Sequence, residues 1–315
     1  MGIGLRFGYY KSGAITRVST NPMRSESDTT AAIDPSLDEQ LTKFARSTQT
    51  GVWTHLDKRQ IISDIRDRII NPYQIQQGEQ PFCGPAAVVF ELIRRQPDRY
   101  IQICQSLYEH GSFEGYSKKF VAAGRLCRSY GNLRMAQADW MILATLRDCA
   151  NKIVPVHPKA PKLIREIGGI TKPWEISAWV RELLGYTDSK SHPTPLSGEF
   201  RAIQAANSTI ESGGVAFALI NSQGLLGHNS FIANHFHRIY PNHWVTIVGN
   251  ISTIGTRSYA TESARKGSQQ YSNNRIEFDI YSWGRKIHVN TDTATIKKFF
   301  WGVITGKSTG NLIQN

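Results

Sequence analysis

Residues 77–95 read Gln-Gly-Glu-Gln-Pro-Phe-Cys-Gly-Pro-Ala-Ala-Val-Val-Phe-Glu-Leu-Ile-Arg-Arg, a polar loop followed at once by an apolar, helix-forming run. Cys83 opens that run, and Pro85 suits the first turn of a helix, where its missing N–H would be unpaired anyway. The sequence therefore predicts a helix that begins at Cys83. The sulfur would then lie at the positive end of the helix dipole, which favours a thiolate.

The chain on both sides of this loop is predicted to be mainly helical as far as about residue 185. In the segment 57–70 isoleucines recur at helical spacing, and the pair Asn71-Pro72 ends that helix. Further helices are predicted after Pro35 and over 98–109, 116–128, 140–149 and 173–185.

Strand-forming sequence appears only after about residue 213. The run 213–221 is apolar and bounded by turn residues, 244–250 is rich in β-branched residues, and 276–281 alternates apolar and polar residues. The polar segment 256–274 is predicted to be a long exposed loop. Because helices precede strands, we expect an α+β fold with a largely antiparallel sheet.

The domain organisation follows from the same change in composition. Residues 1–50 are rich in Ser, Thr, Arg and Gly, so we expect an N-terminal extension over 1–55. It could be a propeptide, a delivery segment or a tail. Residues 56–315 would form the catalytic domain, with a helical insertion near 98–200.

Composition limits the class of protein. The chain is 40% hydrophobic and 20% charged, and no apolar run approaches the ~20 residues that span a bilayer. The first residues lack the apolar core of a secretory signal, so we expect synthesis in a cytoplasm. The net charge of +12 favours an acidic protein partner. Nucleic acid is not expected as the main partner, because the basic residues are scattered and no binding motif accompanies them.

The four cysteines have no metal-type spacing and are too few for a disulfide framework. Cys104, Cys127 and Cys149 are interpreted as structural thiols, whereas Cys83 precedes a helix. An alternative is a metal site that uses the histidines at 228, 235, 237 and 243. No Cys or carboxylate supports it nearby, so polar loop histidines are preferred and no cofactor or metal is expected.

Three segments carry the candidate chemistry. Cys83 is the candidate nucleophile, and His243, at the start of a buried strand, is its candidate base, with His237 in reserve. Asp279, in the next strand, would orient the imidazole. Gln77, six residues before Cys83, would join the Cys83 N–H in holding an oxyanion.

These residues resemble the papain-like cysteine peptidase superfamily. The resemblance rests on Gln77 and Cys83-Gly-Pro-Ala, on the segment His243-Trp-Val-Thr-Ile-Val-Gly, and on an Asp before Ser282-Trp-Gly. The motif style is similar to that of the C39-type peptidases, which cleave after a double glycine. One departure is Tyr281, which stands where papain-like enzymes place Asn. The resemblance covers roughly 75–90 and 214–285.

The resemblance implies a papain-like fold and a cysteine protease that cuts a protein at a small-residue site. Similar domains serve as effectors of bacterial secretion systems, so we expect a toxin that acts in a target cell and an immunity protein that blocks its cleft. An alternative is a peptidoglycan amidase or a protein deamidase. Cell-wall members more often use His as the third residue, so the carboxylate of Asp279 argues against them. A non-enzymatic basic binding protein is the third interpretation.

Overall fold

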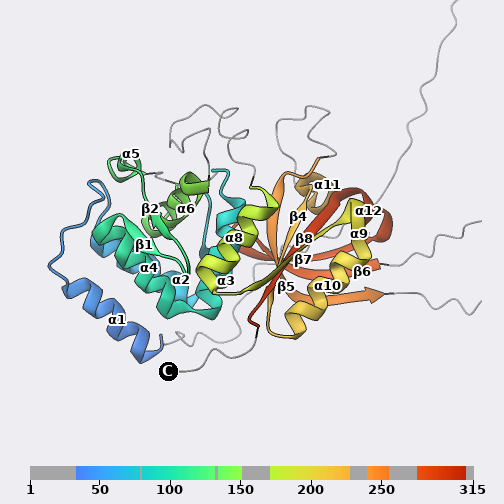
Figure 1. Ribbon diagram of the computed structural model, residues 1–315, viewed down its shortest axis with the longest axis horizontal. Coiled ribbons are helices and arrows are strands. Elements are labelled where there is room, and N and C mark those ends of the chain that lie inside the picture. Colours follow the sequence, from blue (N-terminus) through green and yellow to red (C-terminus); the bar gives the residue numbers. More distant parts are fainter. Residues whose placement is uncertain are drawn as a thin grey trace, which may run out of the picture.

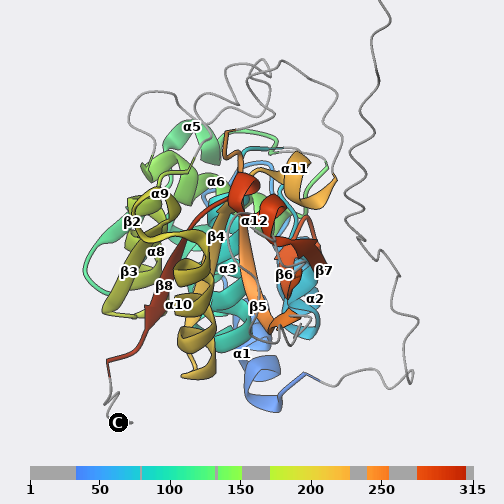
Figure 2. The same ribbon diagram turned by 90° about the vertical axis from the view of Figure 1, so that its right-hand side faces the viewer.

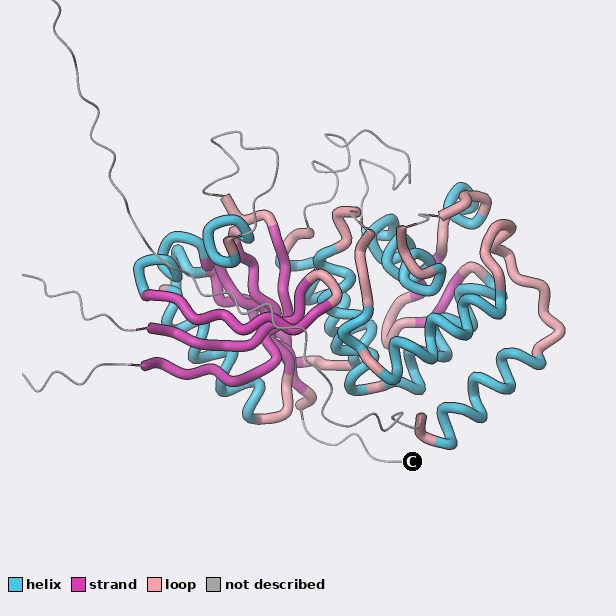
Figure 3. Tube along the Cα trace, turned by 180° about the vertical axis from the view of Figure 1, so that it is seen from behind, coloured by secondary structure: helices cyan, strands magenta, loops and turns pink. Residues whose placement is uncertain are grey.

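The computed structural model describes residues 33–78, 80–131, 134–150, 171–227, 240–254 and 275–309. A group of helices lies on one side of the molecule and a sheet on the other, with α3 and α8 between them (Figure 1). Seen from behind, the strands and the helix-rich part again occupy separate halves, with further helices on the outer side of the sheet (Figure 3). The expected α+β class is confirmed.

The helical part contains most of the predicted helices with small shifts in their ends. Its elements are α1 (Pro35–Arg46), α2 (Lys58–Ile70), the 3-10 turn η1 (Pro72–Gln74), α3 (Cys83–Arg95), α4 (Pro97–His110), α5 (Gly124–Cys127), α6 (Gln137–Ala150) and α8 (Pro173–Leu184). Gly185 ends α8 with a φ of 70°, a left-handed conformation that glycine adopts at little cost.

The helix expected over 116–128 is wrong. This region holds an antiparallel pair, β1 (Ser112–Glu114) and β2 (Lys119–Val121), followed by the short α5. Phe113 pairs with Phe120 across the two strands, and their rings stack with centroids 4.7 Å apart. Burial of both rings on one side of a hairpin outweighs the weak helical pattern of the sequence.

The end of the expected N-terminal extension belongs to the helical core. Leu41 and Phe44 of α1 are fully buried, and Trp53 is 2% exposed in the same apolar cluster. The Trp53 indole N–H also donates to the carbonyl of Leu107 at 2.7 Å. The boundary expected at residue 55 therefore falls inside a packed layer. Helices α4, α6 and α8 share this cluster, so these described helices of the expected insertion pack in the same core as α1 and α3.

The described residues form a six-stranded sheet with the order β3-β8-β4-β5-β6-β7, in which all neighbours are antiparallel. Its strands are β3 (Asp188–Pro193), β4 (Val215–Ile220), β5 (His243–Ile254), β6 (Arg275–Ser282), β7 (Arg285–Asp292) and β8 (Phe300–Lys307). The sequence predicted β4, β5 and β6 but missed β3, β7 and β8. The loop expected over 256–274 lies outside the described residues.

Both faces of the sheet are covered. One face packs on the helical part, and the other packs on α10 (Glu199–Glu211), α11 (Ser222–Leu226) and α12 (Thr293–Phe299), with the short α9 (Thr194–Ser197) beside α10. Figure 2 shows α10 crossing in front of β8 and β4. In β4, Val215 and Phe217 face the helical core while Ala216 and Ala218 face the second core. Burial on both faces explains why its sequence is apolar throughout.

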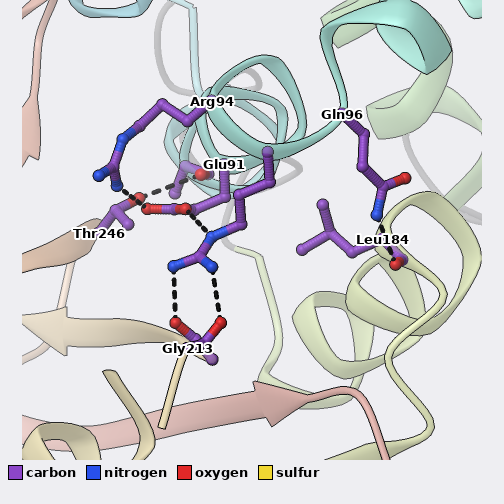
Figure 4. A network of polar contacts seen from close by, with 9 residues as sticks. Glu91, Arg94, Gln96, Leu184, Gly213 and Thr246 are labelled. Carbon is purple, nitrogen blue, oxygen red and sulfur yellow. Dashed lines mark hydrogen bonds and ion pairs between the residues drawn. The ribbon is translucent and has the colours of Figure 1, made fainter. Parts of the chain in front are cut away.

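Polar contacts fix α3 against the sheet (Figure 4). Arg95 donates to the carbonyls of Gly213 and Gly214 at 2.6 and 2.7 Å, just before β4. The buried Glu91 accepts hydrogen bonds from Arg95 and Arg94. Near the other end of the helix, the Thr246 hydroxyl of β5 donates to the Ala87 carbonyl at 3.0 Å. These contacts set how the beginning of α3 meets the beginning of β5.

Within the described residues, no helix combines the length and the apolar character that a membrane crossing requires.

Candidate active site

Cys83 is the first residue of α3, and its side chain is half-buried. Burial raises the pKa of the Cys83 thiol, while hydrogen bonds from the backbone N–H groups of Trp244 and Gly84 and the charge of Arg147 act in the opposite direction. The contact with Trp244 is informative, because the N–H of Trp244 belongs to the residue that directly follows His243. The beginnings of α3 and β5 therefore meet at the Cys83 sulfur.

His243 is the first residue of β5 and is 6% exposed. Its Nε2 lies 2.6 Å from the Ser282 hydroxyl oxygen at the end of β6. The Trp283 ring stacks on the imidazole, with centroids 4.3 Å apart and an interplanar angle of 15°. These two contacts fix the plane of the ring. Since Nε2 contacts Ser282, a proton exchange between His243 and Cys83 would have to use Nδ1.

Ser282 and Trp283 lie at the turn between β6 and β7, and the shape of this turn sets their positions relative to His243. Trp283 has a φ of 48° and Gly284 a φ of 73°, and they join strands paired from Ser282 to Arg285. Two successive positive φ values are typical of the type I′ hairpin turn. A positive φ is uncommon for tryptophan, and such conformations concentrate at functional sites. Here it presents the indole to His243.

The structure does not bring Asp279 to His243. In the ladder Asp279 pairs with Gly249, six residues along β5 from His243, which corresponds to about 20 Å at the usual rise of ~3.3 Å per residue. Burial raises the pKa of Asp279, but hydrogen bonds from Lys286, His288 and Asn250 outweigh it and lower this pKa overall. The expectation that Asp279 orients the imidazole is therefore not met, because strand register separates the two residues.

Ser282 is the site residue that sequence reasoning missed. It lies one residue before Trp283, whereas the resemblance directed attention to Tyr281, two residues before it. Successive side chains of a strand point to opposite faces. Tyr281 enters the helical core, where its ring stacks on Phe90 at 4.0 Å, and Ser282 is left on the face of His243. Knowledge of which strand face carries the histidine would have identified the serine.

Gln77 lies in the loop between η1 and α3. The Gln80 N–H donates to the Gln77 carbonyl at 2.8 Å, and the Phe82 N–H donates to the Gln80 carbonyl at 2.8 Å. These tight turns shorten the path from Gln77 to Cys83. The Gln77 amide oxygen is buried and finds no hydrogen-bond partner among the described residues. This oxygen is an acceptor, so an oxyanion would have to be held by the NH2 group of the same amide.

A buried ion pair supports the other side of Cys83. Arg147 of α6 is 2% exposed and contacts both carboxylate oxygens of Glu175 at 3.0 and 3.1 Å. Arg147 also donates to the Thr171 hydroxyl at 3.0 Å. Thr171 packs on Gly84 so closely that a Cβ at position 84 would lie 2.3 Å from its hydroxyl oxygen. The glycine after Cys83 is therefore required by space.

The remaining sequence candidates lie apart from this site. Cys104 and Cys127 are buried, as expected of structural thiols, whereas Cys149 is exposed, which differs from that interpretation. The histidines at 228, 235 and 237 lie outside the described residues. Where the chain is described, no group of three or more His, Cys, Asp or Glu side chains is arranged to hold a metal ion.

Comparison with models of protein families, with curated proteins and with solved structures finds no match for this chain. Any assignment of function therefore depends on the chemistry of the site. A thiol at a helix start, an oriented imidazole and a side-chain amide in the preceding loop are the kinds of group that nucleophilic attack on a carbonyl uses.

Proposed function

We propose that this chain is a cysteine hydrolase that acts as a peptidase on a protein substrate. The observation that supports this most is that the backbone N–H of Trp244, the neighbour of His243, lies close enough to the Cys83 sulfur to lower the pKa of the thiol. The other side of that imidazole is held by Ser282. Nucleophile, base and orienting group thus come from α3, β5 and β6.

The proposed reaction begins with a neutral thiol. Burial raises the pKa of Cys83, and the neutral hydroxyl of Ser282 stabilises an imidazolium less than a carboxylate would. The proton therefore passes from sulfur to His243 as the sulfur attacks the carbonyl carbon. The Gln77 amide and the Cys83 N–H stabilise the developing oxyanion. His243 then protonates the leaving amine, and water releases the acyl group from the sulfur.

The choice between a peptidase and a wall amidase must be tested directly. A carboxylate as third residue would count against an amidase, but the residue that contacts His243 is the serine Ser282. The resemblance of the Cys and His segments to papain-like peptidases favours the peptidase. The proposal includes cleavage at a small-residue site and a role as a toxin effector. Toxicity only on periplasmic expression would favour wall cleavage instead.

Labelling tests the nucleophile. We expect iodoacetamide or an epoxide inhibitor of the E-64 type to modify Cys83, with the site identified by peptide mass spectrometry. Cys83→Ala should abolish that modification. Cys149→Ser is the matched control, because it removes an exposed thiol of another helix and should leave labelling of Cys83 intact. An epoxide that reacts equally with Cys149 and Cys83 would contradict an activated nucleophile.

Expression in a bacterium tests the activity. The wild type should be toxic or proteolytic, whereas Cys83→Ala and His243→Ala should be harmless at equal protein levels. A comparison of new protein N-termini between wild type and Cys83→Ala would identify the substrate and show whether small residues flank the cut. Persistent toxicity of both variants would contradict an enzymatic role and leave a basic binding protein.

A further inference from the structure

The loop that carries Gln77 is held from several directions. An oxyanion donor is effective only when it is fixed before the reaction, since its orientation then costs nothing in the transition state. Gln77 itself has a buried amide oxygen with no partner within the described parts of the chain. Its backbone is held by the hydrogen bond from the Gln80 N–H to its carbonyl, and its position is also set through its neighbours, Ile75 and Gln76.

The first anchor comes from the strand that orients the base. The Tyr281 hydroxyl donates to the Ile75 carbonyl at 2.8 Å, and the Tyr281 side chain is 3% exposed. Its neighbour Ser282 contacts His243 on the opposite face of β6. Two consecutive residues therefore connect one strand end to both the imidazole and the Gln77 loop.

The second anchor is a buried ion pair. The Gln76 N–H donates to Oδ2 of Asp139 at 3.0 Å, and Arg68 contacts the same carboxylate at 2.8 and 3.2 Å. Asp139 is fully buried and Arg68 is 8% exposed. Burial of such a pair is a poor source of stability compared with apolar packing. What it provides here is a charged acceptor for the backbone next to Gln77.

The third anchor is steric. A Cβ at Gly284 would lie 3.0 Å from Cγ of Gln76, so the Gln76 side chain rests on the turn that presents Trp283 to His243. The loop is thus seated on the same hairpin that fixes the base. A shift of this hairpin would move the imidazole and the amide together.

We infer that Tyr281 and Asp139 are positioning residues that aim the Gln77 amide at the carbonyl oxygen under attack. The inference depends on the proposed function of Cys83 and assigns a role to the tyrosine that departs from the papain-like pattern. Neither residue contacts the reacting atoms. Both act through the backbone of Ile75 and Gln76.

Two probes separate the amide from the nucleophile. Iodoacetamide alkylates sulfur by displacement of iodide, with no oxyanion, so its rate depends on Cys83 and its proton acceptor alone. With p-nitrophenyl acetate the sulfur attacks the ester carbon, the C–S bond forms, the C–O bond breaks and p-nitrophenolate leaves. The thiol proton passes to His243. That acylation passes through an oxyanion and requires Gln77.

Gln77→Ala should lower the acylation rate about 100-fold and leave alkylation of Cys83 unchanged. Tyr281→Phe, which removes only one hydroxyl, should lower acylation about tenfold, again without a change in alkylation. Asp139→Asn should show the same selectivity. Tyr108→Phe, at a buried tyrosine that packs on Phe44, is the matched control and should change neither rate.

The double variant decides whether Tyr281 acts through Gln77. In the Gln77→Ala background, Tyr281→Phe should cause no further loss of acylation. A full tenfold loss there, or an equal fall of acylation and alkylation in Tyr281→Phe alone, would overturn the inference while leaving Cys83 as nucleophile. Failure of wild-type Cys83 to react with either probe would overturn the proposed function as well.

Discussion

The Ser282 hydroxyl contacts the imidazole of His243, so the partner of the candidate base is a neutral group. A serine can accept or donate a hydrogen bond, so it fixes the ring without adding charge. Burial raises the pKa of the Cys83 thiol, and the His243 partner that the structure describes at Nε2 is a neutral hydroxyl, which favours a thiolate–imidazolium pair less than a carboxylate would. Proton transfer coupled to attack is the physical consequence.

Replacement of Ser282 and of Asp279 tests which of the two residues supports the His243 imidazole. Ser282→Ala should lower the rate of Cys83 acylation by p-nitrophenyl acetate about tenfold, because Nε2 loses its partner and the ring its orientation. Asp279→Asn is the matched control and should stay within about twofold of the wild type, since Asp279 contacts Lys286 and His288 instead. A greater loss in Asp279→Asn would restore Asp279 as the third residue.

A second prediction at this scale concerns Asp139. Burial raises the pKa of Asp139 to about 6, against hydrogen bonds from Arg68 and the Gln76 N–H that lower it. A carboxyl whose pKa is raised on folding binds its proton more tightly in the folded state. Its contribution to the free energy of unfolding is therefore present near pH 4 and is lost as the pH rises to about 6.

Urea denaturation of wild type and Asp139→Asn between pH 4 and pH 7 measures this contribution. The difference in unfolding free energy, wild type minus variant, should fall as the pH rises to about 6 and then stay constant. The subtraction removes the pH dependence of the other charged groups. A difference that rises over the same interval would mean that the pKa of Asp139 is lowered.

At the scale of elements, the site depends on how α3 meets the sheet. Thr246 binds the Ala87 carbonyl near the beginning of the helix, and Arg95 binds the carbonyls of Gly213 and Gly214 near its end. Because these contacts lie at both ends, α3 is held along its length against β4 and β5. The strand β6 then adds Ser282 on one face and Tyr281 on the other.

Arg95 and its neighbour Arg94 offer a matched pair of variants. Arg95→Met should lower the free energy of unfolding by about 1–2 kcal/mol, because two carbonyls lose a charged donor. Arg94→Met should cost less than about 1 kcal/mol, since its ion pair with Glu91 is partly exposed. Urea unfolding followed by tryptophan fluorescence measures both. Equal losses would mean that Arg95 acts only through Glu91.

At the scale of the whole molecule, two apolar cores share one sheet. The larger core includes α1 and Trp53, so residues between 35 and 53 are part of the layer on which α4 packs. Arg95 and Thr246 link this layer to the sheet through α3. The site lies where the two parts meet, and its geometry therefore requires both cores to be folded.

Truncation tests this arrangement. A chain that begins at residue 33 should unfold cooperatively, whereas one that begins at residue 56 should lose its cooperative transition. The shorter chain lacks Leu41, Phe44 and Trp53, and loss of one large core side chain alone costs about 2–5 kcal/mol. Thermal unfolding monitored by circular dichroism compares them. Equal midpoints for the two chains would show that residues 33–55 are an extension after all.

The sequence by itself determined the α+β class, the helix that starts at Cys83 and the strand that starts at His243, because helix entry and strand burial are local patterns. The edge strand β3 and the inner strand β8 pair with segments far along the chain, whereas the strands of the hairpin at 112–121 and β7 pair with neighbouring segments and carry only a weak strand pattern of their own. Only the tertiary structure decided that Ser282, and not Asp279, contacts His243. Strand register and the side chain's face select the partner, and both are set by how β6 pairs with β5.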